Sequence, residues 1–471
     1  MGRYLAPVFS DLEKHSLIWG RAPRDRMVAI IAEYRYVAES LASQYGVLHL
    51  NFSGDGHLFL FHNIDVAVQF GLKLVDAWKR SGEANPTLNG LPHMPLRIGC
   101  HFGECTALEG DAWIGRAINL AKRVEGAAEP DTLYVTETVL ELIDLPLYEF
   151  EPTGGHSLKG DYLPERLLYR VTAVDQLALE GRASEELTAD GWFLKGIAFA
   201  GTERDGSEAE ADCYREALRL RSDYPEVHNN LAILLRARGD QAGAAEHYQT
   251  ALRLRPDYPE AHYNYAILLQ SRGSLAGAAD HYREALRLRP DYVDAHQAYA
   301  NLLKARGDRA AAEAHYQKAL QLRPNSPEAH NNYAILLEDK GEIEAAERHY
   351  REALRLRPNY PEAHYNYALL RDNASDAAGA EDSYREALRL WPDYPEAHNN
   401  MAILLQMKGD LVTAEQHYRA ALRLRPSDPE THYNYALLLK AMGRQSGAEE
   451  HFGIAHDLAP DEAASQVAPE P

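Results

Sequence analysis

The 471-residue chain has few cysteines and no long apolar segment. Its three cysteines, Cys100, Cys105 and Cys213, have the spacing of neither a metal site nor a disulfide framework, so they indicate small core residues in a reducing compartment. The absence of a run of about 18 apolar residues argues against insertion into a membrane. The first residues, MGRYLAPVFSDLEKHS, also lack the apolar core of a secretion signal. We therefore expect a cytoplasmic protein.

Positive charge is scarce as well. The chain has 49 Lys and Arg against 70 Asp and Glu, which gives a formal net charge of -21. No basic patch stands out that would neutralise phosphates, so nucleic acid is not an expected partner. The length exceeds that of one ordinary domain, and we expect at least two.

The second half of the sequence repeats itself every 34 residues. PEVHNNLAILLRARGDQAGAAEHYQTALRLRPDY begins at Pro225, and the same frame restarts at Pro259, Val293, Pro327, Pro361, Pro395 and Pro429. This period resembles the tetratricopeptide repeat, in which paired helices stack into an all-α superhelix. In the second copy we predict close helix packing at Ala266, Ala278, Tyr282 and Ala285.

The flanking segments complete the domain division. Residues 191–224 have the length of one repeat but a poor first helix, so we interpret them as a degenerate capping repeat before the seven clear ones. The tail, 461–471, is expected to be disordered. The sequence thus predicts an N-terminal domain over 1–171, a linker over 172–190 and a repeat superhelix over 191–460.

Two polar residue types recur in register within the repeats. Thirteen of the 21 histidines follow the 34-residue period, and we expect them to pack between helices rather than to bind metal. A column of asparagines falls on the first helices: Asn230, Asn264, Asn332, Asn366, Asn400 and Asn434. These helices line the concave face of such a superhelix, so the amides are candidates to bind the backbone of an extended peptide. A consensus residue copied with each repeat explains the column equally well.

From Leu5 to Val171, strand-like and helix-like segments alternate. Residues 47–61, VLHLNFSGDGHLFLF, alternate as a hairpin with Gly54, Asp55 and Gly56 at its tip. Around the hairpin we predict strands in LAPVFSD, LRIGCHFGE, TLYVTETV and LLYRV, and helices over 25–46, 63–80 and 118–128. This order predicts a ferredoxin-like α+β domain.

Five motifs in this order, VFSD, SGDG, LRIGCHFGE, IGRAINLAKR and LKG, resemble the catalytic domain of class III nucleotidyl cyclases. The resemblance implies conversion of a nucleoside triphosphate to a 3′,5′-cyclic nucleotide and pyrophosphate. Asp11 and Asp55 match the family's two aspartates, which hold two Mg²⁺ or Mn²⁺ ions per active site. An aspartate between glycines is commonly just a turn residue, and it is the five motifs together that favour a nucleotide site.

The same resemblance assigns the remaining catalytic groups. Asn119 would orient the ribose, and Arg123, one helical turn later, would stabilise charge on the transferring phosphoryl group. Lys159 would bind the far end of the triphosphate. The phosphate-binding backbone would be that of Leu12, Glu13, Lys14 and His15. Taken singly, Asn119 is equally a local hydrogen-bonding residue and Arg123 a solvated helix charge. Sites of this family form between two chains, so a homodimer is implied.

Base recognition departs from the family pattern. Adenylate cyclases usually carry Lys and Asp at the two base-reading positions and guanylate cyclases Glu and Cys, whereas this chain has Asn51 and Ala112, with Asp111 as a neighbouring substitute. ATP conversion to cyclic AMP is our leading interpretation, and cyclic GMP, UMP or CMP stays open. Two alternatives also stay open: a nucleotide sensor without turnover, and a scaffold acting through its repeats. We expect a protein or peptide bound by the repeats to regulate the cyclase.

Overall fold

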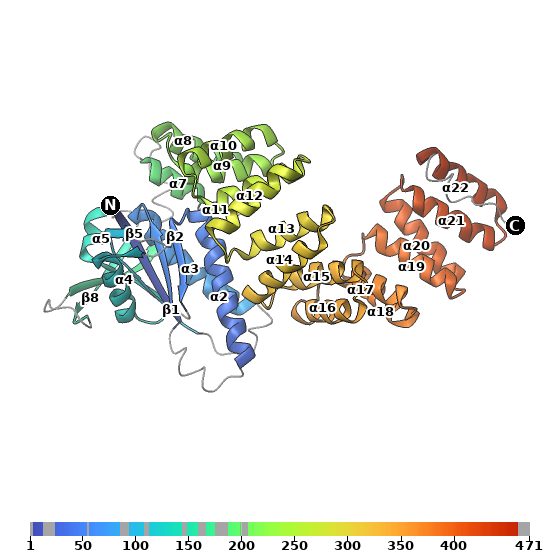
Figure 1. The fold of residues 1–471 in the computed structure, drawn as a ribbon, viewed down its shortest axis with the longest axis horizontal. Helices are drawn as coiled ribbons and strands as arrows, with labels where there is room; N and C mark the ends of the chain where they lie inside the picture. The colour runs from blue at the N-terminus through green and yellow to red at the C-terminus, as the bar shows by residue number, and fades with distance from the viewer. Residues whose placement is uncertain are drawn as a thin grey trace. The chain divides into compact units, whose positions relative to one another are not determined.

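A computed structural model forms two compact units, Met1–Asn325 and Ser326–Pro471 (Figure 1). The first unit contains a sheet domain and the first helical hairpins, and the second contains the remaining hairpins. The structure describes residues 3–12, 24–53, 56–84, 94–107, 113–143, 148–158, 166–174, 187–197, 199 and 206–459.

The described N-terminal residues form one mixed sheet. Its main path runs in the order β2 (His49–Ser53), β3 (Gly56–Phe61), β1 (Arg3–Leu12), β4 (Leu96–Cys100), β7 (Thr132–Thr136), β9 (Arg166–Val174) and β8 (Tyr148–His156). Off this path, β5 (Gly103–Ala107) pairs with β1 and with β6 (Trp113–Ile114). Only β4 and β7 run parallel, while β1 is antiparallel to both β3 and β4. Residues of the central strand β1 can therefore contact residues of both flanking strands, β3 and β4.

Helices cover both faces of this sheet. Helix α3 (Ile64–Ala84) packs on one face and contacts α2 (Arg24–Tyr45), whereas α4 (Arg116–Ala127) packs on the other. The alternation of side chains along β7 gives the physical reason, because Leu133 and Val135 join the core beneath α3 while Tyr134 joins the core beneath α4. The predicted α+β domain is confirmed.

Several elements differ from the prediction, and strands β6 and β8 were not predicted at all. The segment LRIGCHFGE, expected as one strand, breaks after Cys100 into β4 and β5. TLYVTETV ends as a strand at Thr136 and continues as the short helix α5 (Glu137–Leu142), since a brief apolar run does not distinguish strand from helix. Strand β8 contains Pro and Gly and is interrupted by register shifts, as sheet-edge strands can be.

The C-terminal residues form helical hairpins, as the repeat period predicts. The first helices are α7 (Ala189–Ile197), α9 (Pro225–Ala237), α11 (Pro259–Ser271), α13 (Val293–Ala305), α15 (Pro327–Asp339), α17 (Pro361–Asn373), α19 (Pro395–Met407) and α21 (Pro429–Ala441). The second helices are α8 (Glu208–Leu220), α10 (Gln241–Leu254), α12 (Leu275–Leu288), α14 (Arg309–Leu322), α16 (Ile343–Leu356), α18 (Ala377–Leu390), α20 (Leu411–Leu424) and α22 (Gln445–Leu458). The small and aromatic residues predicted to pack, Ala266, Ala278, Tyr282 and Ala285, are buried to 1% exposure or less.

Local sequence explains where these helices begin and end. Proline occupies the first turn of most first helices, where its missing N–H costs nothing. A glycine with positive φ ends most of them, for example Gly239 at 85° and Gly307 at 83°. Asp240 and Asp308 then cap the following helices by accepting a hydrogen bond from the backbone three residues on.

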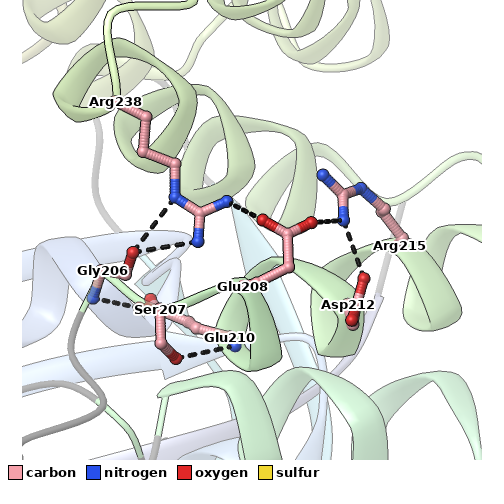
Figure 2. Close-up of polar contacts among 7 residues, drawn as sticks. All are labelled: Gly206, Ser207, Glu208, Glu210, Asp212, Arg215 and Arg238. Carbon is pink, nitrogen blue, oxygen red and sulfur yellow. Dashed lines mark hydrogen bonds and ion pairs between the residues drawn. The ribbon is translucent and has the colours of Figure 1, made fainter.

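The degenerate repeat is anchored by polar contacts at the start of α8 (Figure 2). Ser207 accepts a hydrogen bond from the backbone of Glu210, whose carboxylate accepts one from the backbone of Gly206 at 2.8 Å. Arg238, which follows α9, donates to the carbonyl of Gly206 and pairs with Glu208. These contacts tie the end of α9 to the start of α8, although α7 has only nine residues where the other first helices have thirteen.

The sheet domain and the first repeat helices share one hydrophobic core. Trp192 and Phe193 of α7 and Val227 of α9 belong to the same buried cluster as residues of α2 and α3. Helix α3 also contacts α7 directly. The two regions of the first unit therefore fold as one body. The domain boundaries proposed from the sequence, near 171 and 191, stay predictions.

The repeated histidines form hydrogen-bonded pairs. In six repeats the first-helix histidine lies with its Nδ1 2.8–2.9 Å from the Nδ1 of the second-helix histidine, and the pairs are His228–His247, His262–His281, His296–His315, His330–His349, His398–His417 and His432–His451. The Nε2 of most first-helix histidines faces a backbone carbonyl, which can only accept. Those histidines therefore accept at Nδ1, and their neutral partners donate.

These pairs make the stability of the repeats depend on pH. Burial, followed by the charge of the paired histidine, lowers the pKa of His315, His349 and His417 to about 4 from an ordinary value of 6.5. The unfolded chain therefore binds more protons between these two values, so stability is complete above pH 6.5 and falls as the pH is lowered toward 4. We expect a lower urea midpoint at pH 5 than at pH 7.5, followed by helical circular dichroism.

The matched control uses the repeat that lacks a second-helix histidine. Ser383 occupies that position, and His364 opposite it still donates from Nε2 to the carbonyl of Pro358. The triple variant His315→Ser, His349→Ser, His417→Ser should show a smaller difference between the two midpoints. An unchanged difference would assign the pH dependence to other groups.

Candidate functional site

The candidate site is built around the end of strand β1. In the antiparallel registers, Asp11 lies opposite Gly56 of β3 on one side and opposite Arg97 of β4 on the other. Asp55 directly precedes Gly56 in the chain and lies outside the described residues. The register therefore brings Asp11 beside the residue that follows the second candidate metal ligand.

An arginine compensates the charge of Asp11. The Nη2 of Arg97 lies 3.0 Å from Asp11 Oδ2 and 3.3 Å from Oε1 of Glu125 on α4. All three side chains are less than a quarter exposed, so the pairing is only partly screened by water. Arg97 was not among the predicted site residues, although an arginine inside the apolar strand LRIGC is a signal for such a role.

A buried tyrosine connects β1 and β3. The hydroxyl of Tyr34 on α2 lies 2.6 Å from Oγ of Ser10, which directly precedes Asp11. Its ring contacts the ring of His57, two residues after Asp55, at a centroid distance of 4.7 Å. Burial raises the pKa of Tyr34 and, with the charge of Arg35, lowers the pKa of His57 to about 3, so both groups are neutral at physiological pH. Tyr34 thus holds the two strands at the height of the candidate carboxylates.

Helix α4 carries the other predicted catalytic pair. Asn119 is exposed and Arg123 is half-buried, one turn apart. The helix lies close against β4 because Gly99 has no side chain: a Cβ there would lie 2.1 Å from the backbone nitrogen of Glu125 and 2.4 Å from the carbonyl oxygen of Ala121. The position of Asn119 and Arg123 relative to the sheet therefore depends on Gly99.

Of the other predicted residues, the structure describes two. Asn51 is exposed on β2, opposite Leu58 of β3, and Leu12 is buried opposite Leu96 of β4. The remainder lie outside the described residues: Glu13, Lys14, His15, Asp55, Asp111, Ala112 and Lys159.

Comparison with protein families agrees with this geometry. Residues 5–170 match the family model described as the adenylate and guanylate cyclase catalytic domain. Models of the tetratricopeptide repeat match residues 234–273, 298–361, 334–395 and 365–429. The chain has a cyclase catalytic domain followed by tetratricopeptide repeats.

Solved structures resemble each part separately, whereas curated proteins give no significant match. PilF of Pseudomonas aeruginosa is 24% identical with a TM-score of 0.40, covering 43% of this chain and 92% of that one. The adenylyl cyclase CyaB of the same organism is 21% identical with a TM-score of 0.34, covering 36% of this chain and 95% of that one. The guanylate cyclase domain of RhGC from Catenaria anguillulae is 21% identical with a TM-score of 0.33, covering 37% and 100%. At these identities the likeness concerns the fold alone.

Cyclase domains of this type use divalent metal ions. Within the described residues no three His, Cys, Asp or Glu side chains gather into a metal cluster. The donor that is described, the Asp11 carboxylate, suits a hard cation such as Mg²⁺ or Mn²⁺, and Arg97 has a second acceptor in Glu125. The residues present therefore fit a metal bound at the end of β1. Of the helices that the structure describes, none has the length and apolarity needed to cross a bilayer.

In the repeats, the asparagine column bonds mainly to other asparagines that lie outside the column. Each of Asn264, Asn366 and Asn434 donates a hydrogen bond to an asparagine of the preceding repeat, at 3.1–3.4 Å. Asn400 donates to the hydroxyl of Tyr365, and Asn332 accepts from Asn331 next to it. These contacts favour the structural alternative for most of the column. Asn230 differs, because it donates to the backbone carbonyl of Gln44 in the cyclase domain at 3.0 Å.

The close contact at Gly99 generates a prediction. Gly99→Ala should displace α4 from the sheet and destabilise the protein by about 1–3 kcal/mol, as overpacking does. It should also abolish nucleotide turnover by shifting Asn119 and Arg123. Gly126→Ala is the matched control, since a Cβ at this α4 position meets nothing within 4 Å and should change stability by about 1 kcal/mol or less, in the favourable direction. Urea unfolding of both variants measures the difference, and equal stabilities would contradict the prediction.

Proposed function

We propose that the cyclase domain converts a nucleoside triphosphate, with ATP as the leading substrate, to its 3′,5′-cyclic nucleotide and pyrophosphate. The observation that carries the proposal is the register of β1, which sets Asp11 opposite the residue after Asp55. Two carboxylates at neighbouring strand ends suit the triphosphate chemistry that the matching family performs.

Each predicted residue has a distinct task in this proposal. Asp11 and Asp55 would hold two Mg²⁺ or Mn²⁺ ions, which when bound supply charge neutralisation of the triphosphate and acidify the attacking hydroxyl. Asn119 would orient the ribose, and Arg123 would stabilise the charge on the phosphoryl group as pyrophosphate leaves. Lys159 and the backbone of Leu12 to His15 would bind the phosphates. Arg97 would keep Glu125 as a partner if Asp11 held a cation.

Base selection rests on Asn51 in our proposal. Its amide is exposed on β2 and carries both a donor and an acceptor, so it can meet the matching pair of groups on the edge of adenine. Cytosine offers the same donor and acceptor order as adenine, and guanine and uracil offer the reverse order, which the amide meets by rotating, so Asn51 alone leaves the choice of base open. Ala112 contributes no polar group, and Asp111 would take that part.

The reaction is tested by incubating the purified chain with Mn²⁺ or Mg²⁺ and each of the four ribonucleoside triphosphates in turn. We expect pyrophosphate and a 3′,5′-cyclic product, detected by mass spectrometry, with ATP as the best substrate. Asp55→Ala and Asp11→Asn should be inactive, and Arg123→Ala should lower kcat by about 10²–10³-fold, as loss of a transition-state contact does. Nucleotide binding without any product would favour a sensor over an enzyme.

Sharing of the site between two chains gives a further prediction. We propose a homodimer in which Asp11 and Asp55 come from one chain and Asn119, Arg123 and Lys159 from the other. Mixing inactive Asp55→Ala with the strongly impaired Arg123→Ala should then raise turnover above that of either variant alone, because mixed dimers contain one intact site. Mixing Asp55→Ala with Asp11→Asn restores none, and serves as the control. Equal inactivity of both mixtures, in preparations shown to exchange subunits, would contradict a shared site.

A further inference from the structure

The face of α2 that points away from the sheet lies against the first repeats. Three contacts follow one another along the helix. Arg35 forms an ion pair with Asp291, Tyr36 lies under the guanidinium of Arg323 at 4.0 Å from its ring centroid, and the Gln44 carbonyl accepts a hydrogen bond from Asn230. A cavity of about 360 Å³ remains between α2 and helices α9, α11 and α13.

The ion pair at Arg35 is part of a shielded group of charges. Arg35 is 19% exposed and also bonds Glu39 at 2.8 Å, and Glu39 is 6% exposed. Burial raises the pKa of Glu39, while the neighbouring Arg35 and the charge of Arg289 act in the opposite direction. Asp291 is 41% exposed, so its ion pair with Arg35 is partly screened by water, whereas removal of Arg35 would leave the buried Glu39 without the arginine that bonds it.

The aromatic contact at Tyr36 resembles one that several repeats make internally, although Arg425 also lacks it because Asp428 stands three residues later. Arg221, Arg255 and Arg289 each lie over the tyrosine three residues later, at 3.4–4.7 Å from the ring centroid. Three residues after Arg323 the sequence has Ser326 instead. The cyclase domain supplies the missing ring through Tyr36, so this departure from the repeat consensus matches the docked helix.

The end of α2 is recognised through its backbone. The last carbonyls of a helix have no intrahelical partner, and Asn230 satisfies one of them at Gln44. Gly46 follows in the left-handed conformation, with φ 63°, and a Cβ on it would lie 1.9 Å from Cγ of Glu226 on α9. The chain passes α9 at this distance only because residue 46 is glycine.

The opposite face of the same helix reaches the candidate metal site. Tyr34, next to Arg35 in sequence, bonds Ser10 beside Asp11 and packs on His57 near Asp55. Helix α2 therefore touches the repeats on one side and strands β1 and β3, at Ser10 and His57, on the other.

We propose that the groove formed by α9, α11 and α13 holds α2 as an intramolecular ligand, and that Tyr34 transmits its docking to the metal-binding ends of β1 and β3. Tyr34 is a positioning residue in this scheme. A regulatory partner of these repeats would be a protein helix that presents an arginine–aromatic pair and a free C-terminal turn, in competition with α2. The docking of α2 is inferred from the contacts alone. The effect of docking on the metal site rests on the proposed function.

The test is a double-mutant cycle in the full chain with Arg35→Ala, Asp291→Ala and both together. Hydrogen exchange of residues 35–46 reports docking, and Mn²⁺ titration reports the metal site without requiring turnover. Each single variant should speed exchange in this segment and weaken Mn²⁺ binding by roughly fivefold, at the lower end of coupling between linked sites. The double variant should be no worse than either single one. Asp291 is the decisive position because it lies in the repeats.

Matched controls separate docking from general damage. Arg283→Ala removes an exposed ion pair within α12 and should leave exchange in α2 and Mn²⁺ affinity unchanged. Tyr36→Phe keeps the ring beneath Arg323 and should behave as wild type, whereas Tyr36→Ala should resemble Arg35→Ala.

The outcomes keep the two proposals apart. Additive effects of the two alanine changes, or no change in exchange, would overturn the docking even in an active cyclase. Non-additive exchange without any Mn²⁺ binding would uphold the docking, overturn its transmission to the metal site and count separately against the proposed function. Non-additive exchange with unaltered Mn²⁺ affinity would likewise overturn the transmission.

Discussion

The pairing of β1 between two antiparallel neighbours is the constraint on which the candidate site depends. A shift of one residue in either register would turn Asp11 to the other face of the sheet and separate it from Arg97 and from the hairpin tip. The register is held by side chains on both faces, with Val8 in the core beneath α3 and Leu5 in the core beneath α4. The position of one polar residue is thus set by apolar residues several positions away.

In the repeats, too, buried apolar residues fix the positions of the polar ones, here once in every repeat. Most hairpins bury the same alanines and tyrosine, and these can therefore vary their polar positions without losing their fold. Most of these polar positions carry the same residue in most repeats, so a repeat with a different residue at one of them indicates a different local contact. Ser383 removes one histidine pair, and Ser326 removes one tyrosine from beside an arginine. Asp428 likewise stands where other repeats have a tyrosine. At Arg323 the ring is supplied by Tyr36 of the cyclase domain.

Local pattern was enough to predict the features that recur or alternate. The 34-residue period predicted the hairpins, and the order of the motifs predicted Asp11, Asn119 and Arg123 as site candidates on the strand and helix where they lie. The role of Arg97 was missed because its partners, Asp11 and Glu125, come from separate elements that only the folded sheet brings together. The asparagine column was ambiguous for a related reason, since its hydrogen bonds cross from one repeat to the next.

The contact between α2 and the repeats could not be predicted from local sequence, because Arg35 and Asp291 are separated by 256 positions. Its physical basis is nevertheless ordinary: one charge pair, one stacked guanidinium and one capped helix end. These contacts leave the apolar face of α2 free to pack on the sheet domain, where Tyr34 reaches Ser10. A helix with two occupied faces transmits a displacement better than a flexible tether does, because its backbone is rigid over this length. Attachment through α2 therefore connects the repeats, at Asn230, with Ser10 next to Asp11, through Tyr34.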